Sequence, residues 1–153
     1  MPSLVFSSML GNIRIEANEH TLLEVSLTQE DVSTGASSHP ILTRTQQAID
    51  AYLKGASQYF SLPVKLQGTP FEQDVYRALM AIPYGTTQSY QDIAKSIDRP
   101  RAARAVGQAC GKNPLLLVVP CHRVVASDGS LGGFAHPLAL KKRLLILEQN
   151  SSF

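Results

Sequence analysis

The sequence from residue 69 to residue 111 reads TPFEQDVYRALMAIPYGTTQSYQDIAKSIDRPRAARAVGQACG, and its helix signals decide the fold. Thr69–Glu72 has the pattern of a capping box with proline at the first helical position. Phe71, Val75 and Leu79 recur at intervals of four residues, which places them on one face of a helix. The stretch therefore opens with an amphipathic helix that packs one side into a core.

Two shorter helices follow in the same stretch. Ser89–Asp92 repeats the capping pattern and predicts a helix that extends to about Ile97. Pro100 predicts the start of a third helix, which Gly111 ends. Because only a few residues join these two helices, the pattern is that of a helix-turn-helix.

The third predicted helix has an unusual surface. It is rich in alanine, so another molecule can approach its backbone closely, and Arg101, Arg104 and Gln108 share one face. Residues 99–123 hold five basic residues and no acidic one, although the net charge of the whole chain is only +2. A basic face of this kind can meet phosphates, and a merely solvated helix face is the alternative that charge alone leaves equally open.

Upstream of this helical part, the residues predict a small sheet. Short apolar segments separated by turn residues predict strands at 4–9, 13–18 and 21–27. A polar loop, an amphipathic helix at 41–55 and a short strand at 64–66 follow. We therefore expect an α/β N-terminal domain over residues 1–67, with a small antiparallel sheet and one helix. A mostly α C-terminal domain over residues 68–153, which contains the helix-turn-helix, is expected after it.

Composition and charge argue against several classes of protein. Of the 153 residues, 44% are apolar and 17% are charged, as in a globular protein with a hydrophobic core. The chain has no run of roughly eighteen apolar residues and no basic segment at its start, so we expect neither a membrane span nor a signal peptide. Because only two cysteines occur, Cys110 and Cys121, a reduced cytoplasmic setting is expected.

Cys121 is the candidate nucleophile. The apolar run at 115–119 predicts a buried strand, and Pro120, Cys121 and His122 follow it directly. A cysteine attacks as the thiolate, and an adjacent imidazole can take its proton if a carboxylate orients that imidazole. Because neighbours on an extended chain face opposite sides, we expect a bridging water between the two side chains. The candidate carboxylate is Glu148, on a last predicted helix.

Local chemistry leaves other interpretations of this cysteine open. A single cysteine after an apolar strand is more often an inert core residue than a nucleophile. A metal site has weak support, because Cys110 and Cys121 lack paired-ligand spacing and the four histidines are scattered. A cysteine protease would need a distant histidine with an asparagine or aspartate, which the sequence neither shows nor excludes.

A longer match decides between these interpretations. The motif PCHRVV at residues 120–125 resembles the active-site motif of the O6-alkylguanine-DNA alkyltransferases, also called methylated-DNA–protein-cysteine methyltransferases. The similarity extends in order and spacing over residues 68–94, 101–125 and 129–148. Residues 1–67 match this family only in general character.

The resemblance implies a function in DNA repair. A member of this family would transfer the alkyl group from O6-alkylguanine, and from O4-alkylthymine, in double-stranded DNA to its own Cys121. The damaged base would first flip out of the duplex through the minor groove. Because the product is a stable thioether, each protein molecule would act once. The resemblance further implies a monomer that needs no cofactor or metal and does not associate with a membrane.

The resemblance also assigns roles to individual residues. Cys121 would accept the alkyl group, and His122 would relay the thiol proton through water with Glu148 behind it. Asn113 would tie the recognition helix to the active-site segment, and Tyr90 would crowd a phosphate and touch the flipped base. Arg104 would enter the duplex in place of the extruded guanine. The other residues expected at the DNA are Arg101, Ala102, Ala103, Tyr90, Gln91 and Arg123.

A pocket for the flipped guanine completes the implied site. Its expected lining is Tyr90, Cys110, Val124, Leu131, Gly132, Gly133, Phe134 and Ala135. A main-chain N–H of the loop over residues 132–135 would bind the O6 atom.

Two other functions compete with this interpretation. Alkyltransferase-like proteins share the domain but replace the acceptor cysteine and only mark the lesion, so the presence of Cys121 disfavours that function. A plain helix-turn-helix regulator would account for residues 88–111 but would leave the motif at 120–125 without a task.

Overall fold

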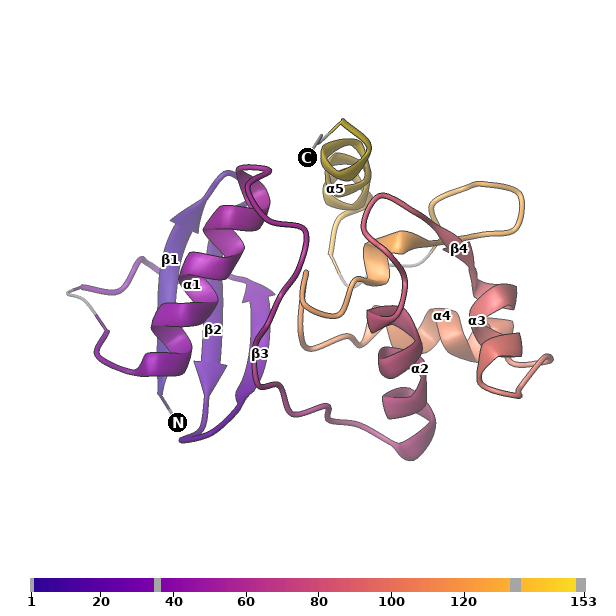
Figure 1. Ribbon diagram of the computed structural model, residues 1–153, viewed down its shortest axis with the longest axis horizontal. Coiled ribbons are helices and arrows are strands. Elements are labelled where there is room, and N and C mark those ends of the chain that lie inside the picture. The colour runs from indigo at the N-terminus through magenta and orange to yellow at the C-terminus, as the bar shows by residue number, and fades with distance from the viewer. Residues whose placement is uncertain (1, 35–36, 133–135, 151–153) are drawn as a thin grey trace. The chain divides into compact units, whose positions relative to one another are not determined.

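The computed structural model describes residues 2–34, 37–132 and 136–150 (Figure 1). The chain forms two compact units. The first consists of Met1–Leu66 with Pro114–Leu116, and the second consists of Gln67–Asn113 with Leu117–Phe153.

The first unit is a three-stranded antiparallel sheet covered by one helix. The strands β1 (Ser3–Ser8), β2 (Gly11–Ala17) and β3 (Leu22–Leu27) pair in the order β1-β2-β3, and α1 (Pro40–Leu53) lies along the sheet (Figure 1). In β2 the buried side chains alternate with half-buried ones, so that one face of the strand meets the apolar side of the helix. The predicted α/β N-terminal part is confirmed.

Two predicted strands are wrong. The segment at 64–66 makes only a single bridge, between Val64 and Leu22. In the run at 115–119, Leu115 makes one bridge with Val25, and the residues after it form a turn in which Leu117 has φ of +71°. Every residue of this run is buried, and a buried turn has the same apolar composition as a buried strand.

The second unit is mostly helical, as predicted. Its helices are α2 (Pro70–Met80), α3 (Tyr90–Ser96), α4 (Ala103–Gly111), the one-turn 3-10 helix η1 (Cys121–Arg123) and α5 (Leu138–Asn150). Its short strands β4 (Gln88–Ser89) and β5 (Val124–Val125) pair in parallel. In the described residues no helix has the length and apolar character needed to cross a membrane.

Both predicted capping boxes are present. The Thr69 hydroxyl accepts from the Glu72 N–H at 3.1 Å, and the Glu72 carboxylate accepts from the Thr69 N–H at 2.9 Å. Ser89 and Asp92 make the same reciprocal pair, with both distances 3.0 Å. Each box satisfies N–H groups that the first turn of its helix leaves unpaired.

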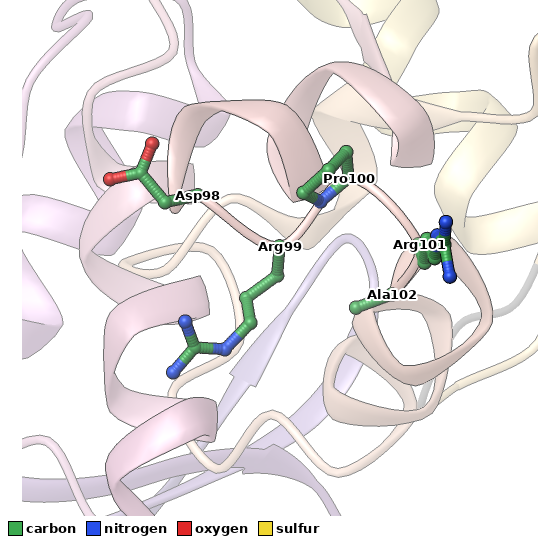
Figure 2. Close-up of a pocket in the computed structure, with 5 residues that line it drawn as sticks. All are labelled: Asp98, Arg99, Pro100, Arg101 and Ala102. Atoms are coloured by element: carbon green, nitrogen blue, oxygen red, sulfur yellow. The ribbon is translucent and has the colours of Figure 1, made fainter.

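The helix-turn-helix is confirmed, but its second helix begins later than predicted. Helices α3 and α4 pack against each other and against α2 (Figure 1). Asp98 has φ of 60°, and the turn continues to Ala102, which caps α4 without a side-chain hydrogen bond. Figure 2 shows this turn, where Arg99 and Arg101 project in different directions around a cavity of about 370 Å³.

Candidate active site and DNA-binding surface

The thiol of Cys121 is buried and held by an asparagine. Cys121 begins η1 directly after Pro120, and only 1% of its surface is exposed. The Asn113 side-chain amide donates to the Cys121 Sγ at 3.2 Å and to the Val119 carbonyl at 2.8 Å. Because Asn113 follows α4 closely, it ties the end of that helix to the segment that carries the thiol. The structure thus brings together two residues to which the resemblance assigned roles in the site.

Burial controls the ionisation of this thiol. Burial raises the pKa of Cys121 to about 11, and the hydrogen bond from Asn113 and the positive charge of Lys141 only partly oppose that increase. The thiol therefore carries its proton at neutral pH. Any attack by this sulfur needs a group that takes the proton during the reaction.

The candidate base stands next to it in the chain. His122 is fully buried, and its Nε2 lies 2.6 Å from Oε2 of Glu148, which is also buried. Burial lowers the pKa of His122, and the hydrogen bond and charge of Glu148 only partly oppose this. The imidazole is therefore neutral at neutral pH and has the protonation state of a base. The structure places His122 and Glu148 together, as the sequence suggested.

The structure does not place Arg123 where a DNA contact would lie. Only 6% of this residue is exposed, and its guanidinium points inward. Its Nε and Nη2 donate to the two oxygens of Glu148, and its Nη1 donates to the Ile82 carbonyl at 2.7 Å. The prediction that Arg123 contacts DNA is corrected accordingly, because these internal partners engage the guanidinium. The basic stretch that suggested DNA binding contains one cation that belongs to the interior.

Lys141 is a buried residue of the site that the sequence analysis missed. Its ammonium donates to the Leu131 carbonyl and to the Tyr90 hydroxyl, and it lies 5.7 Å from the centre of the Tyr90 ring. Burial lowers its pKa, while the neighbouring thiols Cys121 and Cys110 raise it. The missed signal is its spacing, because Lys141, Leu144 and Glu148 recur at i, i+3 and i+7 on one face of α5.

The ring of Tyr90 packs directly on Gly132. This glycine has φ of +69°, and a Cβ placed there would lie 2.5 Å from the Tyr90 ring and hydroxyl. The predicted pocket residues Cys110 and Val124 are buried, and Leu131 is half-buried. Gly133, Phe134 and Ala135 lie outside the described residues.

A cavity of about 380 Å³ opens beside α4. Its lining residues are Tyr90, Gln91, Ala103, Arg104, Gly107, Ala126 and Ser127. The first four were predicted from the sequence, and the last three were not. Arg101 and Arg104 are both exposed. Arg101 and Ala102 line the separate cavity at the turn between α3 and α4 (Figure 2).

Replacement of Gly132 by alanine is expected to push the Tyr90 ring out of place. The new methyl group would overlap the ring, and the positive φ adds strain. We expect loss of most of the alkyl transfer that the resemblance implies, both from free O6-benzylguanine and from alkylated duplex DNA to the protein, measured as the rate of protein alkylation. Gly129→Ala is the matched control, because Gly129 also has a positive φ of +87° but has nothing within 4 Å of the added Cβ. Equal rates in the two variants would contradict this role of Gly132.

The buried thiol of Cys110 makes the stability of the protein depend on pH. Burial raises the pKa of Cys110 to about 12, from a usual value of 9.0. Its contribution to stability is therefore complete below pH 9.0 and is lost as the pH rises towards 12. The measurement is the free energy of unfolding by urea at about pH 8 and about pH 10. Between these values, the free energy of unfolding of Cys110→Ala should fall by roughly 1 kcal/mol less than that of the unmodified chain. Because Cys121 and Tyr76 titrate in both proteins, their effect cancels in this comparison. Identical losses of free energy in the two proteins would contradict the prediction.

Comparison with known proteins places the chain in a family. Residues 70–150 match the model of the 6-O-methylguanine DNA methyltransferase DNA binding domain, and residues 4–66 match that of the ribonuclease-like domain of the same proteins. A methylated-DNA–protein-cysteine methyltransferase of Methanosarcina barkeri is 37% identical over 152 residues, which cover 96% of each chain. The constitutive enzyme of that name from Bacillus subtilis is 39% identical and covers 93% of this chain and 92% of its own.

A solved structure agrees with these relatives. The structure of Mycobacterium tuberculosis OGT in complex with DNA superposes with a TM-score of 0.88 at 34% identity, and covers 98% of this chain and 94% of that one. Together with the matched domains and the two relatives, this similarity shows that the chain belongs to the 6-O-methylguanine DNA methyltransferase family.

Proposed function

We propose that this protein repairs DNA by transferring the alkyl group of O6-alkylguanine irreversibly to its own Cys121. One observation carries the proposal. A thiol held by Asn113 stands next to a neutral imidazole, which is paired with the buried carboxylate of Glu148. This arrangement supplies a nucleophile and a base in a chain whose relatives are named methylated-DNA–protein-cysteine methyltransferases.

The transfer is a displacement at the alkyl carbon. The sulfur of Cys121 forms a bond to this carbon while the bond from the carbon to O6 breaks, and the electron pair of that bond goes to the guanine. The thiol proton passes to His122, directly or through a water, as the sulfur attacks. Because the resulting thioether has no good leaving group, the protein does not return to its starting state.

The leaving guanine needs a proton, and in this proposal Tyr90 and Lys141 supply it. The Tyr90 hydroxyl donates to the departing base, and the Lys141 ammonium, 3.4 Å from that hydroxyl, replaces the proton. Burial already lowers the pKa of Lys141, which makes this ammonium a better donor than an exposed lysine. The proton gained by His122 and the proton lost by Lys141 leave the net charge of the protein unchanged.

The DNA partner is inferred from the relatives and from α4. The similar Mycobacterium tuberculosis OGT was solved in complex with DNA. The small side chains of Ala102 and Ala103 let α4 approach the minor groove, where little sequence information is read. Such an approach suits a protein that inspects any guanine. Exposed Arg104 would fill the gap that a flipped base leaves behind, and Arg101 would meet phosphates.

The remaining expectations belong to the same proposal. O4-alkylthymine carries an alkyl group on a comparable oxygen and would be a second substrate. Residues 1–67 would form a supporting domain, and residues 68–153 would carry DNA binding and transfer. We further propose that the protein acts as a monomer in the cytoplasm, where both of its buried cysteines would stay reduced.

Incubation with a duplex that contains one O6-methylguanine tests the function. The intact mass of the protein should increase by one methyl group in place of one hydrogen, and the yield should saturate at one methyl group per protein molecule. Release of a methylated small molecule with repeated turnover would contradict the proposal, and so would binding of the damaged duplex without any change in protein mass.

A further inference from the structure

Each of the three guanidinium nitrogens of Arg123 donates to an internal acceptor. Its Nε lies 2.8 Å from Glu148 Oε1, its Nη2 lies 3.0 Å from Oε2, and its Nη1 lies 2.7 Å from the Ile82 carbonyl oxygen. The ring of Tyr84 lies 5.6 Å from the guanidinium carbon. A two-point contact between guanidinium and carboxylate fixes the orientation of both groups, which a lysine cannot do. The orientation of the Glu148 carboxylate therefore depends on Arg123.

The same carboxylate also holds the imidazole. Glu148 Oε2 lies 2.6 Å from Nε2 of His122, and Oε1 accepts from the Gly85 N–H at 3.1 Å. An ionised carboxylate only accepts hydrogen bonds, so Nε2 carries the ring proton of the neutral imidazole. The other ring nitrogen, Nδ1, is then the atom that can take a proton. Orientation of Glu148 thus selects which nitrogen acts as the base.

Charge matters as much as orientation. A buried carboxylate at this distance, acting alone, would stabilise the imidazolium, and an imidazolium cannot accept the proton of a thiol. The guanidinium is always charged and lies on the same carboxylate, so it offsets that effect. Protonation of His122 would then place an additional cation in a buried site that already holds Arg123 and Lys141.

We propose that Arg123 is a positioning residue for alkyl transfer, which fixes the Glu148 carboxylate and offsets its charge so that His122 stays neutral and able to accept the Cys121 proton. This inference rests on the proposed function. The charged groups that act on His122 are Glu148 and Lys141 on α5 and Arg123 on η1. Tyr84, which lies before β4 and contacts Arg123, and Tyr76 on α2, which interacts with Cys121, are titratable groups that face η1. Of these, Arg123 and Lys141 lower the pKa of His122, in addition to the larger effect of burial.

Two substitutions separate charge from geometry. Arg123→Met removes the charge at similar length, and Arg123→Lys keeps the charge but loses the two-point contact. In Arg123→Met, the pKa of His122, followed by NMR, should rise by about one to two units. The acid limb of the rate of alkylation by O6-benzylguanine should move to higher pH by the same amount. In Arg123→Lys, the pKa should move less, while the rate falls across the whole pH range.

Arg77→Met removes an exposed arginine whose partner is Asp74, and it should change neither the pKa of His122 nor the pH profile. If Arg123→Met lowers only the unfolding temperature and leaves the His122 titration unchanged, Arg123 is a structural residue and the inference is overturned. If this variant does not fold, the unmodified protein still decides, because titration of His122 at or above its usual value of 6.5 would also overturn the inference.

The NMR titration needs neither DNA nor alkyl transfer. A protein that takes up no alkyl group would disprove the proposed function, while the titration would still measure the effect of Arg123 on His122. A protein that is alkylated normally but shows no shift in Arg123→Met would disprove the inference alone. The two failures are therefore distinguishable.

Discussion

Cys121→Ala is expected to abolish alkyl uptake while the protein keeps its affinity for DNA. The substitution removes the sulfur that forms the new bond, and the other free thiol, Cys110, has the higher pKa. The thiol is buried, and Cys121 is not one of the described residues that line the cavity beside α4. The measurement is intact mass after incubation with a duplex containing O6-methylguanine, together with the dissociation constant for the same duplex.

The other cysteine provides the matched control for this experiment. Cys110 is also buried, and burial raises its pKa further, to about 12, so it is the poorer nucleophile. Cys110→Ala should therefore still take up one methyl group per molecule. Alkylation of Cys121→Ala at any residue would show that Cys121 is not the acceptor. Loss of DNA binding in Cys121→Ala would show instead that the substitution disturbs the fold around η1.

The sequence predicted well those features that depend on neighbouring residues. The capping boxes at Thr69 and Ser89 and the face formed by Val75 and Leu79 are local patterns, and each is present in the structure. The three strands of the first unit were found for the same reason, because alternation of side chains is a property of a single strand. Helical and strand periodicity therefore identified the architecture without a structure.

Features that depend on distant partners were missed. The run at 115–119 was predicted as a strand, but its form is set by contacts with Val25 and by the Asn113 amide, which a local pattern does not contain. Arg123 looked like one more basic residue of a DNA-binding face, and only its two-point contact with Glu148, far along the chain, shows that it belongs to the interior. In the candidate site, the need for a carboxylate behind the imidazole suggested Glu148 as the partner of His122, and the resemblance gave the same pair.

Arg104→Ala is expected to slow repair of duplex DNA about tenfold to a hundredfold and to leave the reaction with free O6-benzylguanine nearly unchanged. Arg104 is exposed at the rim of the cavity that also contains Tyr90 and Gly107. If its side chain fills the gap left by the flipped base, it offsets the free energy of unstacking, which is a few kcal/mol. Without this side chain, the reaction with duplex DNA is slower because that free energy is no longer offset. A free base is already unstacked and incurs no such cost.

Arg101→Ala separates this role from simple charge. Arg101 is also exposed, on the same turn and helix start, and its removal costs the protein one positive charge in the same region. It should weaken binding of damaged and undamaged duplex alike and reduce the dependence of binding on salt. Arg104→Ala should add to this a defect in the transfer step at saturating duplex, followed by rapid quenching. Because only a residue needed for base flipping affects that step selectively, equal losses with free base and duplex would refute the role of Arg104.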